Sequence, residues 1–459
     1  MPVQCSQRRS RGSPRARFRR RALRAQRYSR RSWNNSSAQC SSLSGLRPCV
    51  QGIKSHVTHL GKSPHWRQYS LSSVLQPIVN LKDRDIVGVE ALARGYDNAG
   101  APCDPLSLFA EAAQQRDILS LDRQCREAAF AAYEAAGPGR PDVLFVNLTS
   151  SLLDDPSSSD NYLLEQVHAW GIRPDRVAIE VVESGVRSMD TLRSFAERYR
   201  RHGFLIALDD FGASHSNLER LVELKPDVVK IDRNLVSGVH ENHYKRAVVE
   251  AISGLCHSFG AISLAEGVEH SAELECLTSL GCDLFQGYLL ARPIQDFASE
   301  RDRARETVRF HATQAGSRVA ENALLEYEHT KAIVRTGQDV ADQLHQMVGD
   351  DSELASVIAS LPDVQCAYLT DLGGEQITGT IFNPSTEVRE RALFRPAERG
   401  ADHGLKDYVY HIRTHGAPHY LTGPYLSRAT GTLCRTLSLH TYTRSDTPVI
   451  LCLDIVQQQ

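Results

Sequence analysis

The sequence predicts an α/β barrel that is followed by a smaller α+β domain. Three observations support this fold class. Short apolar runs alternate with amphipathic helical patterns from about residue 71 to residue 300, and run after run ends on a polar or charged residue. After residue 352 the pattern changes to alternating, β-branched segments with turn signals. Because an α/β barrel gathers the carboxyl ends of its strands at one face, polar strand ends predict a functional site there.

Eight strand-like runs define the barrel, and helical patterns connect most of them. The strands are predicted at 74–80, 86–92, 143–148, 176–182, 204–209, 227–231, 261–265 and 283–286. The helices are predicted at 105–135, 160–169, 189–201, 216–224, 242–258 and 271–280. Only a few residues separate the first two strands, whereas parallel strands need a connection of about a dozen or more. The sequence therefore predicts a modified TIM (β/α)8 barrel with an antiparallel first strand.

Three further segments differ from the barrel in composition. Residues 1–68 are rich in Arg and Ser and are predicted to be a disordered tail, with a basic arm that binds nucleic acid or anionic lipid as the alternative. Residues 301–349 predict a long charged connecting helix that is broken near Gly316. Residues 350–459 predict a short helix and a small antiparallel sheet, which is a second domain joined to the barrel (71–300) by that helix.

The charge distribution argues against a nucleic-acid partner for the folded part. Residues 1–82 hold 17 of the 53 Lys and Arg, whereas all 55 Asp and Glu lie from Asp83 onward. An acidic surface disfavours sequence-independent binding to nucleic acid. No apolar run reaches about 18 residues, so we expect no membrane span. The 11 cysteines include no CxxC pair, which favours a reducing compartment such as the cytoplasm.

Acidic side chains stand at the ends of several predicted strands and should meet at one mouth of the barrel. Crowded carboxylates raise one another's pKa values unless cations bind between them. Carboxylate and amide oxygens suit Mg²⁺ or Mn²⁺, and adjacent aspartates can serve two ions about 3.5–4 Å apart. The sequence therefore predicts a two-metal site for attack on a phosphoryl group. The side chains concerned are Glu90, Asn147, Glu180, Asp209, Asp210 and Glu266.

Eight motifs follow one another across residues 71–300. They are QPIV (76–79), EALAR (90–94), FVNLT (145–149), EVVES (180–184), DDFG (209–212), VKID (229–232), AEGVE (265–269) and QGYLLARP (286–293). Their order resembles that of the EAL-domain phosphodiesterases, which hydrolyse the bacterial second messenger cyclic di-GMP to linear pGpG. Together the motifs make the resemblance specific, whereas the tripeptide EAL alone carries no information.

The resemblance implies a role for each matching residue. Two Mg²⁺ or Mn²⁺ ions would be held, the first by Glu90, Asn147, Glu180 and Asp209, and the second by Asp209, Asp210 and Glu266. The attacking water would lie near Lys230, and Glu266 would act either in the shell of the second metal or as the general base. Cyclic di-GMP would contact Gln76 and Gln286, and Arg94 would bind a phosphate through its forked guanidinium.

Three more acidic residues match positions that support the site in the family. Glu183 and Glu269 would support the catalytic groups, with Glu183 anchoring the loop that follows residue 209. Asp232 would lie at the metal and dimer region, beside the substrate. The family also implies a homodimer.

One loop departs from the family pattern. The sequence reads DFGASHSNL where the family usually has DFGTGYSSL, so that Ser214 replaces a glycine and His215 a tyrosine. Because this loop couples metal binding to dimerisation in the family, turnover could be reduced. A cyclic di-GMP receptor without turnover is therefore the alternative function, and an enolase-like barrel acting on a small acid is a third.

The C-terminal region resembles PAS-like or Cache-like sensory modules, which implies an unidentified small ligand. The polar candidates for a ligand pocket in this region are Asp371, Tyr425 and Arg435. A packing or dimerisation domain without a ligand is the alternative.

Overall fold

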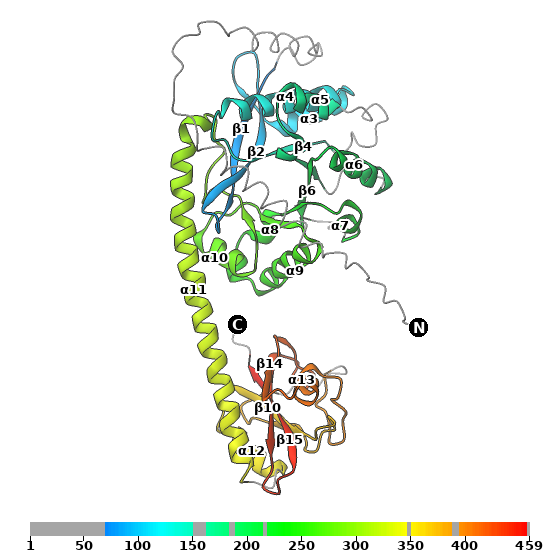
Figure 1. Cartoon of the computed structure of the whole chain (residues 1–459), viewed down its shortest axis with the longest axis vertical. Coiled ribbons are helices and arrows are strands. Elements are labelled where there is room, and N and C mark those ends of the chain that lie inside the picture. The colour runs from blue at the N-terminus through cyan, green and yellow to red at the C-terminus, as the bar shows by residue number, and fades with distance from the viewer. Residues whose placement is uncertain are drawn as a thin grey trace, which may run out of the picture. The chain divides into compact units, whose positions relative to one another are not determined.

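The computed structural model describes residues 69–149, 162–182, 189–213, 218–346, 350–387 and 394–456. The chain divides into two compact units, of which the first ends at Val319 and the second begins at Ala320 (Figure 1). In the described ranges, no helix is both long enough and apolar enough to cross a membrane.

The first unit is a closed barrel whose first strand runs against its neighbours. The strands follow the order β1-β9-β8-β7-β6-β5-β4-β2, and β1 pairs with β2 to close the ring. β1 is antiparallel to both β2 and β9, and the other barrel pairs are parallel. The predicted fold class, including the antiparallel first strand, is therefore confirmed. The bounds are β1 (Ser70–Asn80), β2 (Asp85–Tyr96), β4 (Val143–Leu148), β5 (Val177–Val182), β6 (Leu205–Phe211), β7 (Val228–Ile231), β8 (Ile262–Ala265) and β9 (Leu284–Phe285).

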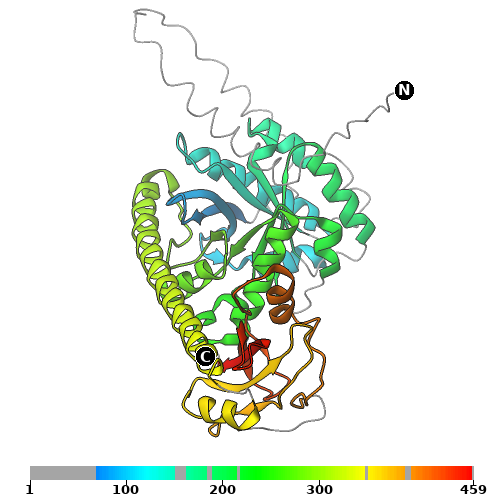
Figure 2. The ribbon, with the colours of Figure 1, turned by 60° about the horizontal axis from the view of Figure 1, so that its bottom comes forward.

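The helices lie outside the strands (Figure 2). They are α3 (Pro105–Gln114), α4 (Ile118–Ala135), α5 (Tyr162–Ala169), α6 (Met189–Arg201), α7 (Leu218–Leu224), α8 (Arg233–Val236), α9 (His243–Phe259) and α10 (Ser271–Ser279). A short strand, β3 (Pro102–Cys103), pairs with the end of β2. The predicted helix at 105–135 is wrong in one respect, since it is two helices. Arg116 takes a left-handed φ of 57° between them, which ends the first helix.

The inside of the barrel is closed below its mouth by one layer of apolar side chains. This interior layer consists of Ile78, Phe145, Ala178, Ala207, Val228, Leu264 and Leu284. β2 contributes Gly88 to the same level, where a Cβ atom would lie 3.0 Å from the ring of Phe145. The absence of a side chain at Gly88 therefore leaves the room that Phe145 fills.

Helix α11 (Phe297–Leu344) is continuous through Gly316, so the predicted break there is wrong. A single glycine in a helix costs only about 1 kcal/mol relative to alanine, and the packed turns on either side outweigh that cost. Before Gly316 the helix packs on the barrel core through Val308, Ala312 and Ala315. Its last turns belong to the core of the second unit.

The second unit is built on an antiparallel sheet in the order β11-β10-β15-β14-β12, with β13 also paired to β14. The strands are β10 (Val364–Thr370), β11 (Ile381–Phe382), β12 (His419–Leu421), β13 (Tyr425–Leu426), β14 (Leu433–Tyr442) and β15 (Pro448–Val456). One face packs on α11 and α12 (Asp351–Ile358) through Leu369, Leu437 and Leu453. The other face carries Tyr368 and Cys452 under α13 (Asp407–His415).

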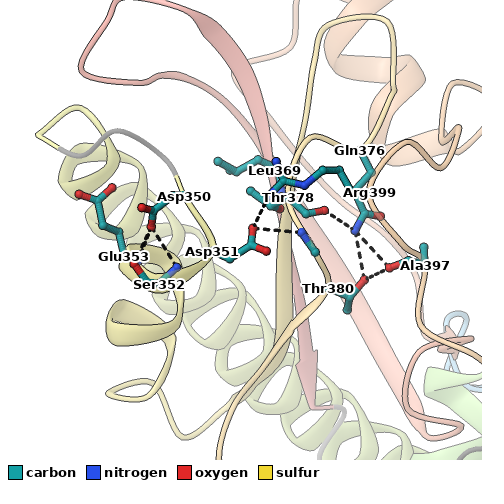
Figure 3. A network of polar contacts seen from close by, with 11 residues as sticks. Asp350, Asp351, Ser352, Glu353, Leu369, Gln376, Thr378, Thr380, Ala397 and Arg399 are labelled. Atoms are coloured by element: carbon teal, nitrogen blue, oxygen red, sulfur yellow. Dashed lines mark hydrogen bonds and ion pairs between the residues drawn. The ribbon is translucent and has the colours of Figure 1, made fainter.

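A polar network joins α12 to the segment that follows β10 (Figure 3). Asp351 Oδ1 accepts a hydrogen bond from Gly379 N at 3.1 Å and pairs with Arg399 Nη2 at 3.2 Å. The buried amide of Gln376 donates to Thr378 O, Thr380 Oγ1 and Ala397 O. The network gives this irregular segment a fixed path over the sheet.

The three polar residues predicted for a C-terminal ligand pocket each have a local contact. Asp371 Oδ1 accepts from Glu375 N at 2.9 Å and closes a turn. Arg435 Nε donates to Thr422 O at 2.9 Å, and Tyr425 OH contacts Thr436 Oγ1 at 2.5 Å. Because neighbouring positions on a strand face opposite ways, Arg435 lies on the opposite face of β14 from Thr436, the partner of Tyr425.

Candidate active site

Each of the eight barrel strands brings one polar side chain to the mouth, two positions along from the interior layer. Since side chains on a strand alternate between faces, positions i and i+2 point the same way. Glu90, for example, lies two residues after Gly88, and Lys230 two residues after Val228. In the antiparallel β1 the direction is reversed, so Gln76 lies two residues before Ile78. The ring at the mouth is Gln76, Glu90, Asn147, Glu180, Asp209, Lys230, Glu266 and Gln286.

Lys230 lies at the centre of this ring and is 1% exposed. Its Nζ is 2.6 Å from Glu180 Oε1, 2.7 Å from Glu266 Oε1 and 2.8 Å from Asp209 Oδ1. Glu90 Oε2 is more distant, at 3.6 Å. Burial alone would lower the pKa of Lys230, but the surrounding carboxylates outweigh it and raise the pKa well above its ordinary value. Lys230 therefore carries a full positive charge.

Three carboxyl groups of this cluster, those of Glu180, Glu266 and Asp210, have pKa values above the ordinary range. Burial raises the pKa of Glu180 well above its ordinary value, with Glu90 adding to the effect and Lys230 opposing it. Burial likewise raises the pKa of Glu266 to about 8, although Lys230 acts to lower it. The pKa of Asp210 is raised by burial and by neighbouring Asp209. One lysine is thus too little positive charge for this cluster.

An irregularity in β6 turns two adjacent carboxylates toward the same site. The pairing of β6 with β7 shifts register between Leu208 and Phe211, and Asp210 takes a left-handed φ of 54°. A regular strand would send Asp209 and Asp210 to opposite faces. Here carboxylate oxygens of Asp209, Asp210 and Glu266 lie within 4.8 Å of one another.

These residues fit the divalent cations that the sequence predicts. Glu180 Oε2 is buried and has no hydrogen-bond donor in the part of the chain that the structure describes. Glu180 Oε1 and Asp209 Oδ1 share the single Lys230 ammonium with Glu266 Oε1. Buried carboxylate oxygens with so few donors are suitable ligands for Mg²⁺ or Mn²⁺.

Amide side chains orient Glu90 and line the mouth. Gln286 Nε2 donates to Glu90 Oε2 at 2.7 Å, and Asn147 Nδ2 donates to Glu90 Oε1 at 3.3 Å. Gln76 Nε2 donates to the backbone oxygen of Ala291 at 3.3 Å. Among the residues that the structure describes, the buried carbonyl oxygen of Gln286 has no donor, so it is available for a cation or a substrate.

Several predicted site residues lie beside the ring and do not join it. Arg94, further along β2, donates to Ala93 O at 2.8 Å. Asp232 caps α8 by accepting from Asn234 N at 2.9 Å, and Glu269 pairs with Arg233 at 2.9 Å. Glu183, Ser214 and His215 lie outside the described residues. The roles of all these residues remain predictions.

The sequence did not identify Glu273, which the structure shows to hold two loops near the barrel mouth. Its buried carboxylate accepts from Gly238 N, Glu269 N and His270 N, each at 2.9–3.0 Å. It therefore joins the loop after β7 to the loop after β8, where Glu266 lies. The signal in the sequence was a glutamate at the third position of α10, as in a capping box.

The residue after Gln286, Gly287, must be a glycine because the backbone of Val268 lies against it. A Cβ atom on Gly287 would lie 2.1 Å from Val268 O and 2.2 Å from Val268 N. The loops after β8 and β9 can meet only because Gly287 has no side chain. This backbone contact holds Gln286 at the mouth, where Gln286 O also accepts from Val268 N at 3.0 Å.

Residues 65–293 match the family of the EAL domain. The chain contains an EAL domain. The domain covers the whole barrel and every residue of the ring at its mouth, so the resemblance predicted from the motifs is confirmed.

Two relatives and one solved structure place the EAL domain among known proteins. The EAL-domain protein YkuI of Bacillus subtilis is 28% identical over 318 residues, which are 68% of this chain and 77% of YkuI. The crystal structure of YkuI with c-di-GMP and calcium covers 89% of this chain and 99% of that one, with a TM-score of 0.71 at 22% identity. That likeness shows a shared fold over both units. The oxygen sensor DosP of Escherichia coli is 30% identical over 230 residues, which are 49% of this chain and 28% of DosP.

Several relatives match about half of this chain. An Azorhizobium caulinodans protein is 31% identical over 235 residues, but the match spans only 32% of that protein. The chain thus covers about a third or less of the length of this relative and of DosP.

Proposed function

We propose that the EAL domain hydrolyses cyclic di-GMP to linear pGpG with two divalent cations, Mg²⁺ or Mn²⁺. The observation that carries the proposal is the cluster of carboxylates at the barrel mouth, which one lysine neutralises only in part. The sequence motifs favour this substrate, and the crystal structure of YkuI contains c-di-GMP.

Different residues of the chain would bind the two ions and contact the attacking water. Glu90, Asn147, Glu180 and Asp209 would hold one ion, and Asp209, Asp210 and Glu266 the other. When bound, the ions stabilise charge on the phosphoryl group and lower the pKa of a bound water. Lys230 Nζ and Glu266 Oε1 are 2.7 Å apart and offer a cation and a proton acceptor to that water. Water adds to phosphorus, the bond to one ribose oxygen breaks, and that oxygen takes up a proton.

Substrate recognition is assigned to residues around the ring. Gln76 and Gln286 would line the pocket, Arg94 would bind a phosphate, and Asp232 would lie next to the substrate. Glu183 and Glu269 would support the catalytic groups from the loops after β5 and β8.

The direct test is incubation of the purified protein with cyclic di-GMP and Mn²⁺ or Mg²⁺, with pGpG followed by chromatography. EDTA should abolish turnover, and Glu90→Ala and Asp209→Ala should each reduce kcat/KM by more than about 10²-fold, because both supply metal ligands. Asp302→Ala is the control, since that carboxylate is 82% exposed and pairs with Arg301 and Arg305 of its own helix. Wild-type rates in Glu90→Ala and Asp209→Ala would contradict the mechanism.

A receptor that binds cyclic di-GMP without turnover is the second candidate. It is favoured by the sequence DFGASHSNL, which places Ser214 where the family has glycine. If a left-handed backbone is needed there, serine costs about 1 kcal/mol or more, and Ser214→Gly should increase turnover. Tight binding of cyclic di-GMP without pGpG in both proteins would favour the receptor.

We also propose that residues 350–459 form a PAS-like or Cache-like sensory domain that binds a small ligand and regulates the EAL domain in a homodimer. The cytoplasm is the proposed location, which agrees with free thiols at all described cysteines. A chain that ends at Val319 keeps the turns of α11 that pack on the barrel. Identical kcat and oligomeric state in that chain and in the full chain would argue against regulation.

A further inference from the structure

A buried carboxylate on α4 holds the end of strand β4. Asp122 is 2% exposed, and its Oδ1 accepts hydrogen bonds from both Thr149 N at 3.1 Å and Thr149 Oγ1 at 3.0 Å. Its Oδ2 pairs with Arg126, one turn further along the same helix and also buried. Asp122 thus uses one oxygen for the strand end and the other for a fixed counter-charge.

The partner of Asp122 is itself held from α5. Arg126 Nε donates to Gln166 Oε1 at 3.1 Å, and Gln166 Nε2 donates to Glu127 Oε1 at 2.7 Å. Glu127 also accepts from Trp170 Nε1 at 2.7 Å. Because these groups are largely buried and hydrogen-bonded, the Asp122 side chain has one well-defined orientation.

The strand end that Asp122 holds lacks pairing on one side. β4 pairs with β2 only as far as Val146, opposite Ala91, whereas its pairing with β5 continues through Asn147 and Leu148. On the β2 side, the described contact that reaches Asn147 is its own long hydrogen bond to Glu90, at 3.3 Å. Thr149 is the last residue described before the segment 150–161. The hydrogen bonds from Thr149 to Asp122 therefore hold the chain just beyond the last residue of β4 that pairs with a neighbouring strand.

We propose that Asp122 is a positioning residue for Asn147, acting through Thr149 to direct the Asn147 amide to the barrel mouth. The inference rests on the proposed function, in which Asn147 supplies an oxygen to one of the cations. Outer partners of metal ligands change metal affinity by about 10–100-fold when they are lost. Asp122 belongs to this class although it touches neither the cation nor the substrate.

The test measures Mn²⁺ binding by calorimetry in the absence of substrate. Asp122→Asn should weaken binding by about 10-fold or more, since an amide cannot both accept from Thr149 and pair with Arg126. Thr149→Val removes only the hydroxyl contact and should weaken binding in the same direction by a smaller factor. Thr149→Ser keeps the hydroxyl and should restore the affinity. Asp283→Asn is the matched control, because Asp283 Oδ2 likewise accepts from the N and Oγ of one residue, Ser263, at 3.1 and 2.9 Å, but near the start of β8. Its Mn²⁺ affinity should stay within about twofold of wild type.

A double-mutant cycle separates positioning from a general loss of packing. If Asp122 acts through Asn147, Asp122→Asn should change Mn²⁺ affinity little in a protein that already carries Asn147→Ala. An equal loss in both backgrounds would overturn the proposal, as would wild-type affinity in Asp122→Asn and Thr149→Val. If Asp122→Asn fails to fold, the same test uses the Mn²⁺ affinities of Thr149→Val and Thr149→Ser, each measured with and without Asn147→Ala. A wild-type protein that neither binds Mn²⁺ nor cleaves cyclic di-GMP would count against the proposed function itself.

Discussion

Gln286 donates a hydrogen bond to Glu90 over 2.7 Å, although strand β1 separates the two strands from which they come. The same Glu90 oxygen is 3.6 Å from Lys230, and its other oxygen accepts from Asn147. Glu90 is therefore oriented by three neighbours from three different strands. Its orientation depends on the closed ring more than on β2 alone.

Removing the Gln286 amide should loosen Glu90 before any substrate binds. We expect Gln286→Ala to weaken Mn²⁺ binding by about 10-fold, in the range found for outer partners of metal ligands, and to lower kcat/KM further through lost substrate contact. Calorimetry with Mn²⁺ checks the first effect, and steady-state kinetics with cyclic di-GMP check the second. Gln115→Ala, an exposed glutamine on the outer surface, is the control. Unchanged Mn²⁺ affinity would show that Gln286 contacts Glu90 without orienting it.

Replacing Lys230 with a similar apolar side chain should make the stability of the protein depend on metal. In EDTA, Lys230→Met leaves buried carboxylates without their counter-charge, and breaking a buried pair costs about 3–5 kcal/mol. Added Mn²⁺ should restore much of this loss, so that Tm rises more in the variant than in wild type. Differential scanning fluorimetry with EDTA or Mn²⁺ measures both values. Lys331→Met, at an exposed lysine of α11, is the control. Equal melting of variant and wild type in EDTA would contradict the prediction.

Glu273 should make a contribution to stability that is lost in acid. Burial acts to raise its pKa, but hydrogen bonds from three backbone N–H groups outweigh burial and lower the pKa below 4.5. A depressed pKa stabilises the fold above the ordinary value, and this contribution disappears as pH falls through the folded-state pKa. Urea unfolding should therefore show Glu273→Gln less stable than wild type at pH 7, with a smaller difference below about pH 4. Glu275→Gln, at a half-buried glutamate of the same helix, is the control. A constant difference for Glu273→Gln would refute the argument.

Two glycines of α11 should respond oppositely to alanine. At Gly316 a Cβ atom meets nothing within 4 Å, so Gly316→Ala should stabilise the protein by about 0.5–1 kcal/mol through helix propensity. At Gly337 a Cβ atom would lie 2.4 Å from Leu437 Cδ2 and 2.9 Å from Leu439 Cδ1, so Gly337→Ala should destabilise the second unit. Thermal unfolding of both variants checks the pair. A destabilised Gly316→Ala would mean that the glycine is needed for a bend or a contact.

The sequence predicts the barrel well because its signals are local and repeated. A run such as VVKI followed by Asp232 marks a strand and its end, and the short link after β1 requires an antiparallel pair. The same repetition places Glu90, Glu180 and Lys230 at one mouth. The family motifs, rather than composition, then indicate the substrate.

The rest depends on contacts that are distant in sequence. The hydrogen bond from Thr149 to Asp122 joins residues that are 27 positions apart, and the contact of Gly287 with Val268 joins two loops. Neither interaction therefore has a local sequence pattern that predicts it. In the second unit, α13 and the short strands β12 and β13 lie in a segment without a clear period and were not predicted. Continuity of α11 at Gly316 was missed because packing outweighed the low helix propensity of one residue.

The reversed first strand decides from which end the polypeptide enters the barrel. In a barrel of eight parallel strands, the first strand begins at the end opposite the catalytic loops. Here Ser70 pairs with Tyr96, beyond Glu90 on β2, so β1 begins at the open end and runs inward past Gln76. Any tag, partner module or reporter fused just before Tyr69 would therefore emerge beside the barrel mouth, and a bulky fusion there should hinder access to the ring of polar side chains.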